Sequence, residues 1–320
     1  MNLPFSTTLE AQTLLRRYLP LSRLVAAAGL SAKTGRDVYL KLESDLPTGS
    51  FKPRGALYAL SVNAARRPIR EVTASSTGNH GAAVALAAKL LGIPATIFLP
   101  ANPNPVKRAR IAALGANIVE VGHADLRVAY EQALAYSRTQ GVYFLNDATD
   151  PDLPAGPATI AIEIFEQLPS VDTIVVPIGD TALIRGVAAA AKRLSPTVRI
   201  IGVQAEQAPS YFLSWRQGRA VSTETCNTIA DGLATRAPDP DNVRAIRELV
   251  DDIVLVTEDQ MLAAIRHLAL NEHTIAEPAG AATTAALLQA RLQVGHHTAL
   301  LVTGANISPD MLRSAICGLT

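Results

Sequence analysis

The sequence has few residues of the kinds on which disulfide-rich, metal-rich and nucleic-acid-binding proteins depend. Its 320 residues include two cysteines and one tryptophan, and aromatic side chains make up 4%. Cys226 and Cys317 lie far apart in the sequence and without metal-ligand spacing, so we expect both to be reduced, buried thiols. The small aromatic fraction argues against a surface that stacks on nucleic-acid bases.

An excess of one charge and long apolar runs are also lacking. The net charge is +1, which gives no bias toward nucleic acid or anionic membranes. Threonine, glycine, proline or charged residues interrupt each apolar stretch well before it reaches membrane-spanning length. The sequence starts Met-Asn-Leu-Pro-Phe-Ser, without the basic segment and apolar run of a signal peptide. We therefore expect a cytoplasmic protein with no nucleic-acid or membrane partner.

Several motifs that identify other ligand sites are missing as well. No two glycines are separated by a single residue, which excludes the G-x-G of a dinucleotide-binding loop. Neither a G-x-x-x-x-G-K-[ST] phosphate loop nor a G-x-S-x-G nucleophile motif occurs. His296 and His297 are adjacent rather than at metal-ligand spacing, so we interpret them as surface residues.

What the sequence does contain is a regular alternation of helical and apolar strand segments. Before residue 146 it predicts strands at 38–42, 72–75, 95–99, 117–121 and 142–145, and helices at 7–19, 56–65, 81–91, 106–114 and 126–139. Glycine directly after several of the helices, and strands that are apolar throughout, are typical of βαβ units around a buried parallel sheet.

A segment rich in proline, glycine and aspartate, residues 146–157, interrupts this alternation and marks the main boundary. After it we predict strands at 173–176, 198–203, 252–256 and 298–302, and helices at 158–167, 182–193, 241–249, 258–270, 279–292 and 309–317. Residues 204–240 are expected to be irregular. The predicted fold class is α/β, with two open twisted sheets, each in its own domain.

One lysine lies at an unusual position in this pattern. Lys52 follows a predicted strand and begins a helix, within the stretch Thr48–Ala56. Pro53 suits the first helical position, and Gly55 allows close approach of the backbone. A lysine held at such a turn can act as a fixed amine nucleophile. From this stretch alone, however, a solvated surface lysine is the more common explanation.

Three other junctions between a strand and a helix or turn carry unusual residues, and ligands of open α/β sheets bind at such junctions. The stretch Ser75–Gly81 could bind an anion or carboxylate at a helix N-terminus, or could simply cap the helix. Residues 177–183 could bind a phosphate through backbone amides and the Thr181 hydroxyl, although Asp180 adds a negative charge there. Residues 303–306 follow the last strand and could be only a turn.

In combination, these motifs resemble the fold type II, or tryptophan synthase β-like, pyridoxal-phosphate enzymes. Within that family the sequence is most similar to the serine/threonine dehydratase branch. The resemblance extends from about Pro20 to Ala315. The motifs that carry it, in this order, are Ser50–Ala56, Ser76–Gly81, Thr228–Gly232 and Glu277–Gly280.

The resemblance implies a cofactor, pyridoxal 5'-phosphate, in the cleft between two domains. Residues 1–54 and 149–320 would form the large cofactor-binding domain, and residues 55–148 a smaller mobile domain. A homodimer that acts on a small amino acid is also implied. Because the chain ends at Thr320, without the regulatory domain of biosynthetic threonine dehydratases, we do not expect feedback inhibition by isoleucine.

The resemblance also assigns roles to individual residues. Lys52 would bond covalently to the cofactor, with Phe51 beside it, and Asn79 would bind the cofactor's 3-hydroxyl. Thr303 would face the pyridine nitrogen, and Glu277 would lie near the ring. The phosphate would be bound by Gly179, Asp180, Thr181, Ala182 and Leu183. The substrate carboxylate would be bound by Ser76, Thr77, Gly78, Asn79 and His80.

The sequence departs from the family pattern at three places. Gly179, Asp180, Thr181 and Ala182 replace a run of four glycines in the phosphate loop. Gln204, Ala208 and Ser210 stand where metal-activated serine racemases carry Glu, Ala and Asp, so we expect no Mg²⁺ or Ca²⁺ site. Thr77 replaces the serine that serves as the second base of those racemases, which makes racemisation a weaker prediction.

The activity implied is that of an ammonia-lyase, which converts a β-hydroxy-α-amino acid such as L-threonine or L-serine to a 2-oxo acid and ammonia. The alternatives within the family are an amino-acid racemase, a threonine-synthase-like enzyme and a β-replacement enzyme. Pro53 stands where synthases of the family commonly carry aspartate, which argues against the last two. A non-catalytic amino-acid-binding protein is a further alternative.

Overall fold

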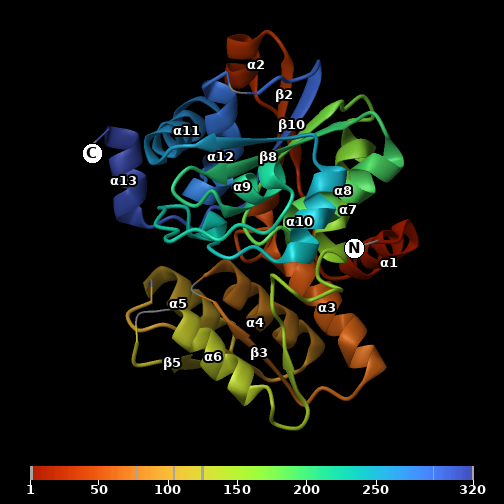
Figure 1. Cartoon of the computed structure of the whole chain (residues 1–320), viewed down its shortest axis with the longest axis vertical. Coiled ribbons are helices and arrows are strands. Elements are labelled where there is room, and N and C mark those ends of the chain that lie inside the picture. The colour runs from red at the N-terminus through yellow and green to blue at the C-terminus, as the bar shows by residue number, and fades with distance from the viewer. Residues whose placement is uncertain (1–2, 77, 104, 124–125, 291, 319–320) are drawn as a thin grey trace.

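The computed structural model describes residues 3–76, 78–103, 105–123, 126–290 and 292–318. Helices and strands alternate along most of the chain, and the strands form two separate sheets (Figure 1). The predicted α/β class is therefore confirmed.

The larger sheet has six strands in the order β1-β2-β10-β7-β8-β9. Only the β1–β2 pair is antiparallel among these strands. The bounds are β1 (Leu24–Ala26), β2 (Asp37–Leu42), β7 (Thr173–Pro177), β8 (Arg199–Ala205), β9 (Asp252–Val256) and β10 (His297–Val302). Every residue of the central strand β7 is buried, as the continuous apolar pattern predicts for a parallel strand covered on both faces.

The smaller sheet has four parallel strands in the order β5-β4-β3-β6. The bounds are β3 (Glu71–Ser75), β4 (Ala95–Leu99), β5 (Asn117–Glu120) and β6 (Val142–Phe144). Strand β2 precedes the strands of the smaller sheet in sequence. It pairs with β10, which lies near the other end of the chain. The larger sheet is thus built from both ends of the chain.

The helices cover both sheets. They are α1 (Phe5–Leu15), α2 (Ala28–Thr34), α3 (Lys52–Arg66), α4 (Asn79–Leu91), α5 (Pro105–Ala113), α6 (Leu126–Tyr136), α7 (Ala155–Gln167), α8 (Ala182–Leu194), α9 (Ser210–Gln217), α10 (Pro240–Leu249), α11 (Glu258–Asn271), α12 (Pro278–Leu288) and α13 (Pro309–Cys317). Short 3-10 turns occupy Glu43–Asp45 and Asp231–Leu233. Figure 1 shows α4, α5 and α6 with the smaller sheet in the lower part of the molecule.

Alternate residues of the central strands pack against helices on opposite faces. Leu300 and Val302 of β10 lie in the apolar cluster formed with α11 and α12. Ala299 and Leu301 lie in the cluster formed with α7 and α8. This period of two is what a strand between two helical layers requires. In the part of the chain that the structure describes, no helix is both long enough and apolar enough to cross a membrane.

Three predictions from the sequence are wrong in detail. Residues 204–240 are not wholly irregular, because they contain α9, which begins at Ser210, ends at Gln217 and is followed by Gly218 as a left-handed cap. Helix α7 begins at Ala155, three residues earlier than predicted, since Pro157 lies in its first turn, where no N–H is needed. The cysteines are unpaired, but Cys226 is only half-buried and Cys317, at the end of α13, is exposed.

Candidate active site

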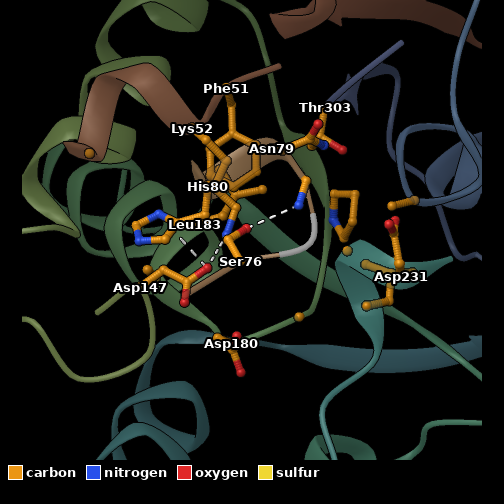
Figure 2. Close-up of a pocket in the computed structure, with 18 of the residues that line it drawn as sticks. Phe51, Lys52, Ser76, Asn79, His80, Asp147, Asp180, Leu183, Asp231 and Thr303 are labelled. Atoms are coloured by element: carbon orange, nitrogen blue, oxygen red, sulfur yellow. Dashed lines mark hydrogen bonds and ion pairs between the residues drawn. The ribbon is translucent and has the colours of Figure 1, made fainter. Parts of the chain in front are cut away.

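Nearly all of the site residues predicted from the sequence line one cavity (Figure 2). The predicted site residues that line it are Phe51, Lys52, Ser76, Gly78, Asn79, His80, Gly179, Asp180, Thr181, Ala182, Leu183, Glu277 and Thr303. Thr77 lies outside the described residues. The convergence is informative because these residues come from distant parts of the chain.

The topology of both sheets explains why they converge. In the smaller sheet the chain builds β3, β4 and β5 in one direction and then returns to place β6 on the other side of β3. In the larger sheet it builds β7, β8 and β9 outward and returns to place β10 beside β7. Such reversals open a crevice at the carboxyl ends of the strands. The segments after β3, β6, β7 and β10 all line the cavity.

Lys52 is the first residue of α3, and its amine lies inside the cavity. The Nζ atom is 2.6 Å from Oδ2 of Asp147 and 5.5 Å from the centre of the Phe51 ring. Burial lowers the pKa of the Lys52 amine, but the charges of Asp147, Asp180 and Glu277 outweigh that effect and the pKa is raised. Lys52 is therefore an ammonium with a carboxylate partner in this arrangement.

A buried ionic network holds the start of α3 in place. Arg54, two residues after Lys52, donates to Glu43 through Nε at 2.7 Å and to Glu163 through Nη1 at 2.7 Å. Lys41 of β2 is 2.7 Å from Glu163, and Ser22 donates to Glu43. These side chains are almost fully buried. The network ties α3 to β2 and α7, so Lys52 is carried on a rigid part of the fold.

Asp147 and His80 form a second polar pair beside Lys52. His80 Nε2 lies 2.9 Å from the carbonyl oxygen of Leu145, so this nitrogen carries the hydrogen. Its Nδ1 atom is 4.0 Å from Asp147 Oδ2 and has no hydrogen-bond partner among the described residues. Burial lowers the pKa of His80, which favours the neutral ring. Burial raises the pKa of Asp147, but the charge of Lys52 and the hydrogen bond from its amine outweigh burial, and the pKa of Asp147 lies well below its usual value.

Asn79, the first residue of α4, is held by hydrogen bonds with Glu277, which precedes α12, and Asn306, which follows β10. Its Nδ2 donates to Glu277 Oε1 at 2.5 Å, and its Oδ1 accepts from Asn306 at 2.6 Å. Glu277 Oε2 has no hydrogen-bond partner in the described part of the chain. Burial raises the pKa of Glu277 to about 7.

The loop before α8 presents a helix N-terminus to the cavity. Thr181 has φ 67° and no side chain caps the helix by a hydrogen bond. Arg185, one turn later, donates from Nε to the Thr181 hydroxyl at 3.0 Å. A left-handed residue before an uncapped helix forms an amide concavity suited to an anion. Asp180 does not cap the helix; it accepts from Thr235 at 2.9 Å, and burial raises its pKa to about 6.

Several residues that line the cavity had no role in the predictions from sequence. Asp147 follows β6, a fourth strand end at the same edge as Ser76, and the rule that ligands bind at strand ends would have found it. Asp231 and Gly232 lie in the recognised motif Thr228–Gly232, but only the fold places them here. Asp231 forms an ion pair with Lys107. The aromatic residues of α9, Tyr211, Phe212 and Trp215, are not among those that line the cavity.

The three residues compared with the racemase metal site lie apart from the cavity lining. Gln204 and Ala208 are buried, and Gln204 accepts a hydrogen bond from the Phe212 amide at 2.9 Å. Ser210 donates to the carbonyl oxygen of Thr235 at 2.5 Å. Among the described residues there is no group of three or more His, Cys, Asp or Glu side chains placed to hold a metal ion.

The fold is α/β and places a lysine amine in a cavity lined by segments from both sheets, and comparison with known proteins gives the family. Residues 16–304 match the family described as "Pyridoxal-phosphate dependent enzyme". The chain belongs to this family.

Individual relatives agree with that assignment. The chain is 39% identical to the L-threonine ammonia-lyase of Thermotoga maritima over 303 residues, which cover 95% of this chain and 75% of that protein. It is 33% identical to the L-threo-3-hydroxyaspartate ammonia-lyase of Saccharomyces cerevisiae, with 97% and 95% covered. The structure of maize serine racemase superposes with a TM-score of 0.93 at 28% identity, and 99% and 98% of the two chains are covered.

The cavity fits the cofactor of this family. Lys52 supplies an amine that can bond to an aldehyde. The uncapped N-terminus of α8 supplies amides for a phosphate. A Cβ at Gly179 would lie 2.2 Å from the Gly232 carbonyl oxygen, so this part of the loop has room only for glycine. The unpaired Oε2 of Glu277 leaves a buried polar atom for a ligand to meet.

Proposed function

We infer that this chain is a pyridoxal-phosphate-dependent ammonia-lyase that converts a β-hydroxy-α-amino acid, such as L-threonine or L-serine, to a 2-oxo acid and ammonia. The observation that carries the inference is the convergence of one lysine amine with two helix N-termini, those of α4 and α8. One suits a substrate carboxylate and the other a cofactor phosphate. Ammonia-lyases from bacteria and yeast are among the similar proteins.

We propose the following cofactor contacts. Lys52 bonds to the cofactor aldehyde beside Phe51, and Asn79 donates to or accepts from the 3-hydroxyl. Thr303 faces the ring nitrogen and Glu277 lies beside the ring. The phosphate contacts Gly179, Asp180, Thr181, Ala182 and Leu183. Asp180 suits this loop better as a neutral acid, and its raised pKa supports that form near an anion.

The substrate carboxylate, in this proposal, binds at the start of α4, at Ser76, Thr77, Gly78, Asn79 and His80. Helix α4 has no side-chain cap, and the Gly78 amide donates to Ser76 Oγ at 3.1 Å. Lys52, as a free amine, takes the proton from the substrate Cα, because a positioned amine in the cavity is a suitable general base. When bound, the cofactor supplies the electron sink that makes this proton acidic.

The division into domains and the association state are part of the same proposal. We assign residues 1–54 and 149–320 to a large domain and residues 55–148 to a smaller mobile one, which separates the two sheets. We also propose that two copies of the chain form a homodimer; Leu9, Tyr18 and Leu21 are among the exposed apolar side chains. The exposed thiol of Cys317 suits a reducing, cytoplasmic compartment.

The test is release of a 2-oxo acid from purified protein loaded with pyridoxal 5'-phosphate. L-Threonine, L-serine, L-threo-3-hydroxyaspartate and L-threo-phenylserine are compared by kcat/KM, and D-serine formation is followed in parallel. We expect 2-oxo acid and ammonia in equal amounts from at least one of the four. Racemisation without any 2-oxo acid would contradict the proposal, and so would inactivity toward the whole panel.

A further inference from the structure

Asp147 contacts the reacting amine, and nothing in the proposal above uses it. Its Oδ2 atom is 2.6 Å from Lys52 Nζ and 4.0 Å from His80 Nδ1. Figure 2 shows Asp147 and His80 on one side of Lys52, with Thr303 and Asp231 on the other. The carboxylate is only 23% exposed and points into the cavity from the loop after β6.

The position of Asp147 puts it within reach of the bond that breaks. In a β-hydroxy-α-amino acid the hydroxyl is carried by the carbon next to Cα. A side chain that hydrogen-bonds to the base acting at Cα is therefore close enough to contact that hydroxyl. Hydroxide is a poor leaving group, so its departure needs a proton donor at the oxygen.

We propose that Asp147 is the proton donor to the leaving hydroxyl, which rests on the ammonia-lyase function inferred above. The Cα–H bond breaks and its proton goes to Lys52 Nζ. The electron pair forms a Cα–Cβ double bond while the Cβ–O bond breaks with its electrons on oxygen. The proton of the Asp147 carboxyl goes to that oxygen, which leaves as water. The unsaturated amino acid is then hydrolysed to a 2-oxo acid and ammonia.

The protonation states that this step produces are those of the ion pair in the structure. It leaves Lys52 as an ammonium and Asp147 as a carboxylate, which is the ion pair observed at 2.6 Å. Transfer of one proton across that contact restores the amine and the carboxylic acid. These two groups supply both proton transfers of the elimination.

The surroundings of Asp147 favour the acid form whenever Lys52 is uncharged. The charged and titratable groups that face it are Lys52, His80 and Asp180. Burial raises the pKa of Asp147, and the charge of Lys52, the largest of the effects that lower this pKa, is absent once Lys52 is an uncharged amine. The neutral His80 ring turns an unprotonated Nδ1 toward Asp147. A carboxylic acid is the form that matches this partner.

A simpler role for Asp147 is to neutralise the charge of Lys52. Substrates with different leaving groups distinguish this role from that of a proton donor. L-Serine and β-chloro-L-alanine give the same product, pyruvate, so one assay serves both. Chloride leaves without a proton, whereas hydroxide does not. A proton donor matters only for serine, while a counter-ion of Lys52 matters equally for both substrates.

The experiment compares Asp147→Asn with the wild-type holoenzyme. We expect kcat/KM for L-serine to fall at least about 100-fold, the usual range for loss of a general acid, and kcat/KM for β-chloro-L-alanine to fall less than about fivefold. Asp147→Glu, which keeps a carboxylic acid, should recover part of the serine activity. Asp152→Asn removes a carboxylate from the same loop that pairs with Arg66 outside the cavity, and should leave both activities unchanged.

The outcomes separate the two proposals. Equal losses on both substrates in Asp147→Asn would overturn the role of Asp147 as proton donor while leaving the ammonia-lyase function intact. Activity on β-chloro-L-alanine also reports that the variant has folded and holds its cofactor. Failure of the wild-type enzyme to release a 2-oxo acid from any β-hydroxy amino acid would overturn the function itself, and the role of Asp147 with it.

Discussion

Asn79 Nδ2 donates a hydrogen bond to Glu277 Oε1 at 2.5 Å, and this contact joins the layers of the two sheets. Asn79 begins α4 beside the smaller sheet, and Glu277 precedes α12 beside the larger one. Because Asn306 donates to the other end of the same amide, the orientation of Asn79 is fixed. A side chain proposed to meet the cofactor ring is thus positioned before any ligand binds.

The Glu277 carboxyl should make stability depend on pH. Burial raises its pKa from 4.5 to about 7, so the folded protein holds this proton more tightly than the unfolded chain does. The free energy of unfolding should therefore fall as pH rises from about 4.5 to about 7, by up to about 3 kcal/mol. Urea denaturation of the cofactor-free protein across this range measures it.

Glu277→Gln provides the comparison, because it keeps an oxygen that accepts from Asn79 but cannot titrate. The variant should lose that part of the pH dependence, while the similar contribution from Asp180, whose pKa is about 6, stays in both proteins. Parallel curves for the two proteins would show that Glu277 does not titrate as described.

The phosphate loop should not tolerate a side chain at Gly179. An alanine Cβ there would lie 2.2 Å from a backbone oxygen of Gly232, so the loop would have to move. We expect Gly179→Ala to weaken pyridoxal 5'-phosphate binding at least about tenfold, which corresponds to about 1.4 kcal/mol. Absorbance titration of the cofactor-free protein measures the affinity. Gly122→Ala, which meets nothing within 4 Å, should bind as the wild type does.

Loss of Arg54 should destabilise the fold strongly. Arg54→Met leaves the buried carboxylates of Glu43 and Glu163 without their guanidinium, and breaking such a buried network costs about 3–5 kcal/mol. The matched control is Arg16→Met, whose partner Glu166 is exposed, and it should cost less than about 1 kcal/mol. Equal urea midpoints for the two variants would show that the buried network contributes little.

Much of the fold could be predicted because it depends on local signals. Apolar strands bounded by glycine and proline identified both sheets, and the predicted strand at 298–302 lies within β10. The order of strands could not be predicted, since the pairing of β10 with β2 joins residues that are distant in sequence. Helix α9 was missed because it is only eight residues long and its apolar pattern is weak.

The candidate site shows the same division. Lys52, Asn79 and Thr181 were found because strand–helix junctions and family motifs mark them. Asp147 was missed, since it lies in a loop rich in proline and aspartate that was interpreted as a boundary, and the strand-end rule was not applied to it. Only the return of the chain to place β6 beside β3 brings it next to Lys52.

The central claim is that Lys52 is the residue that bonds to the cofactor, and reductive labelling tests it directly. The protein is incubated with pyridoxal 5'-phosphate, reduced with borohydride, digested and mapped by mass spectrometry. We predict one label per chain, on Lys52, and none in Lys52→Ala under the same conditions. A label on another lysine such as Lys41 or Lys107, or equal labelling of the variant, would contradict the account.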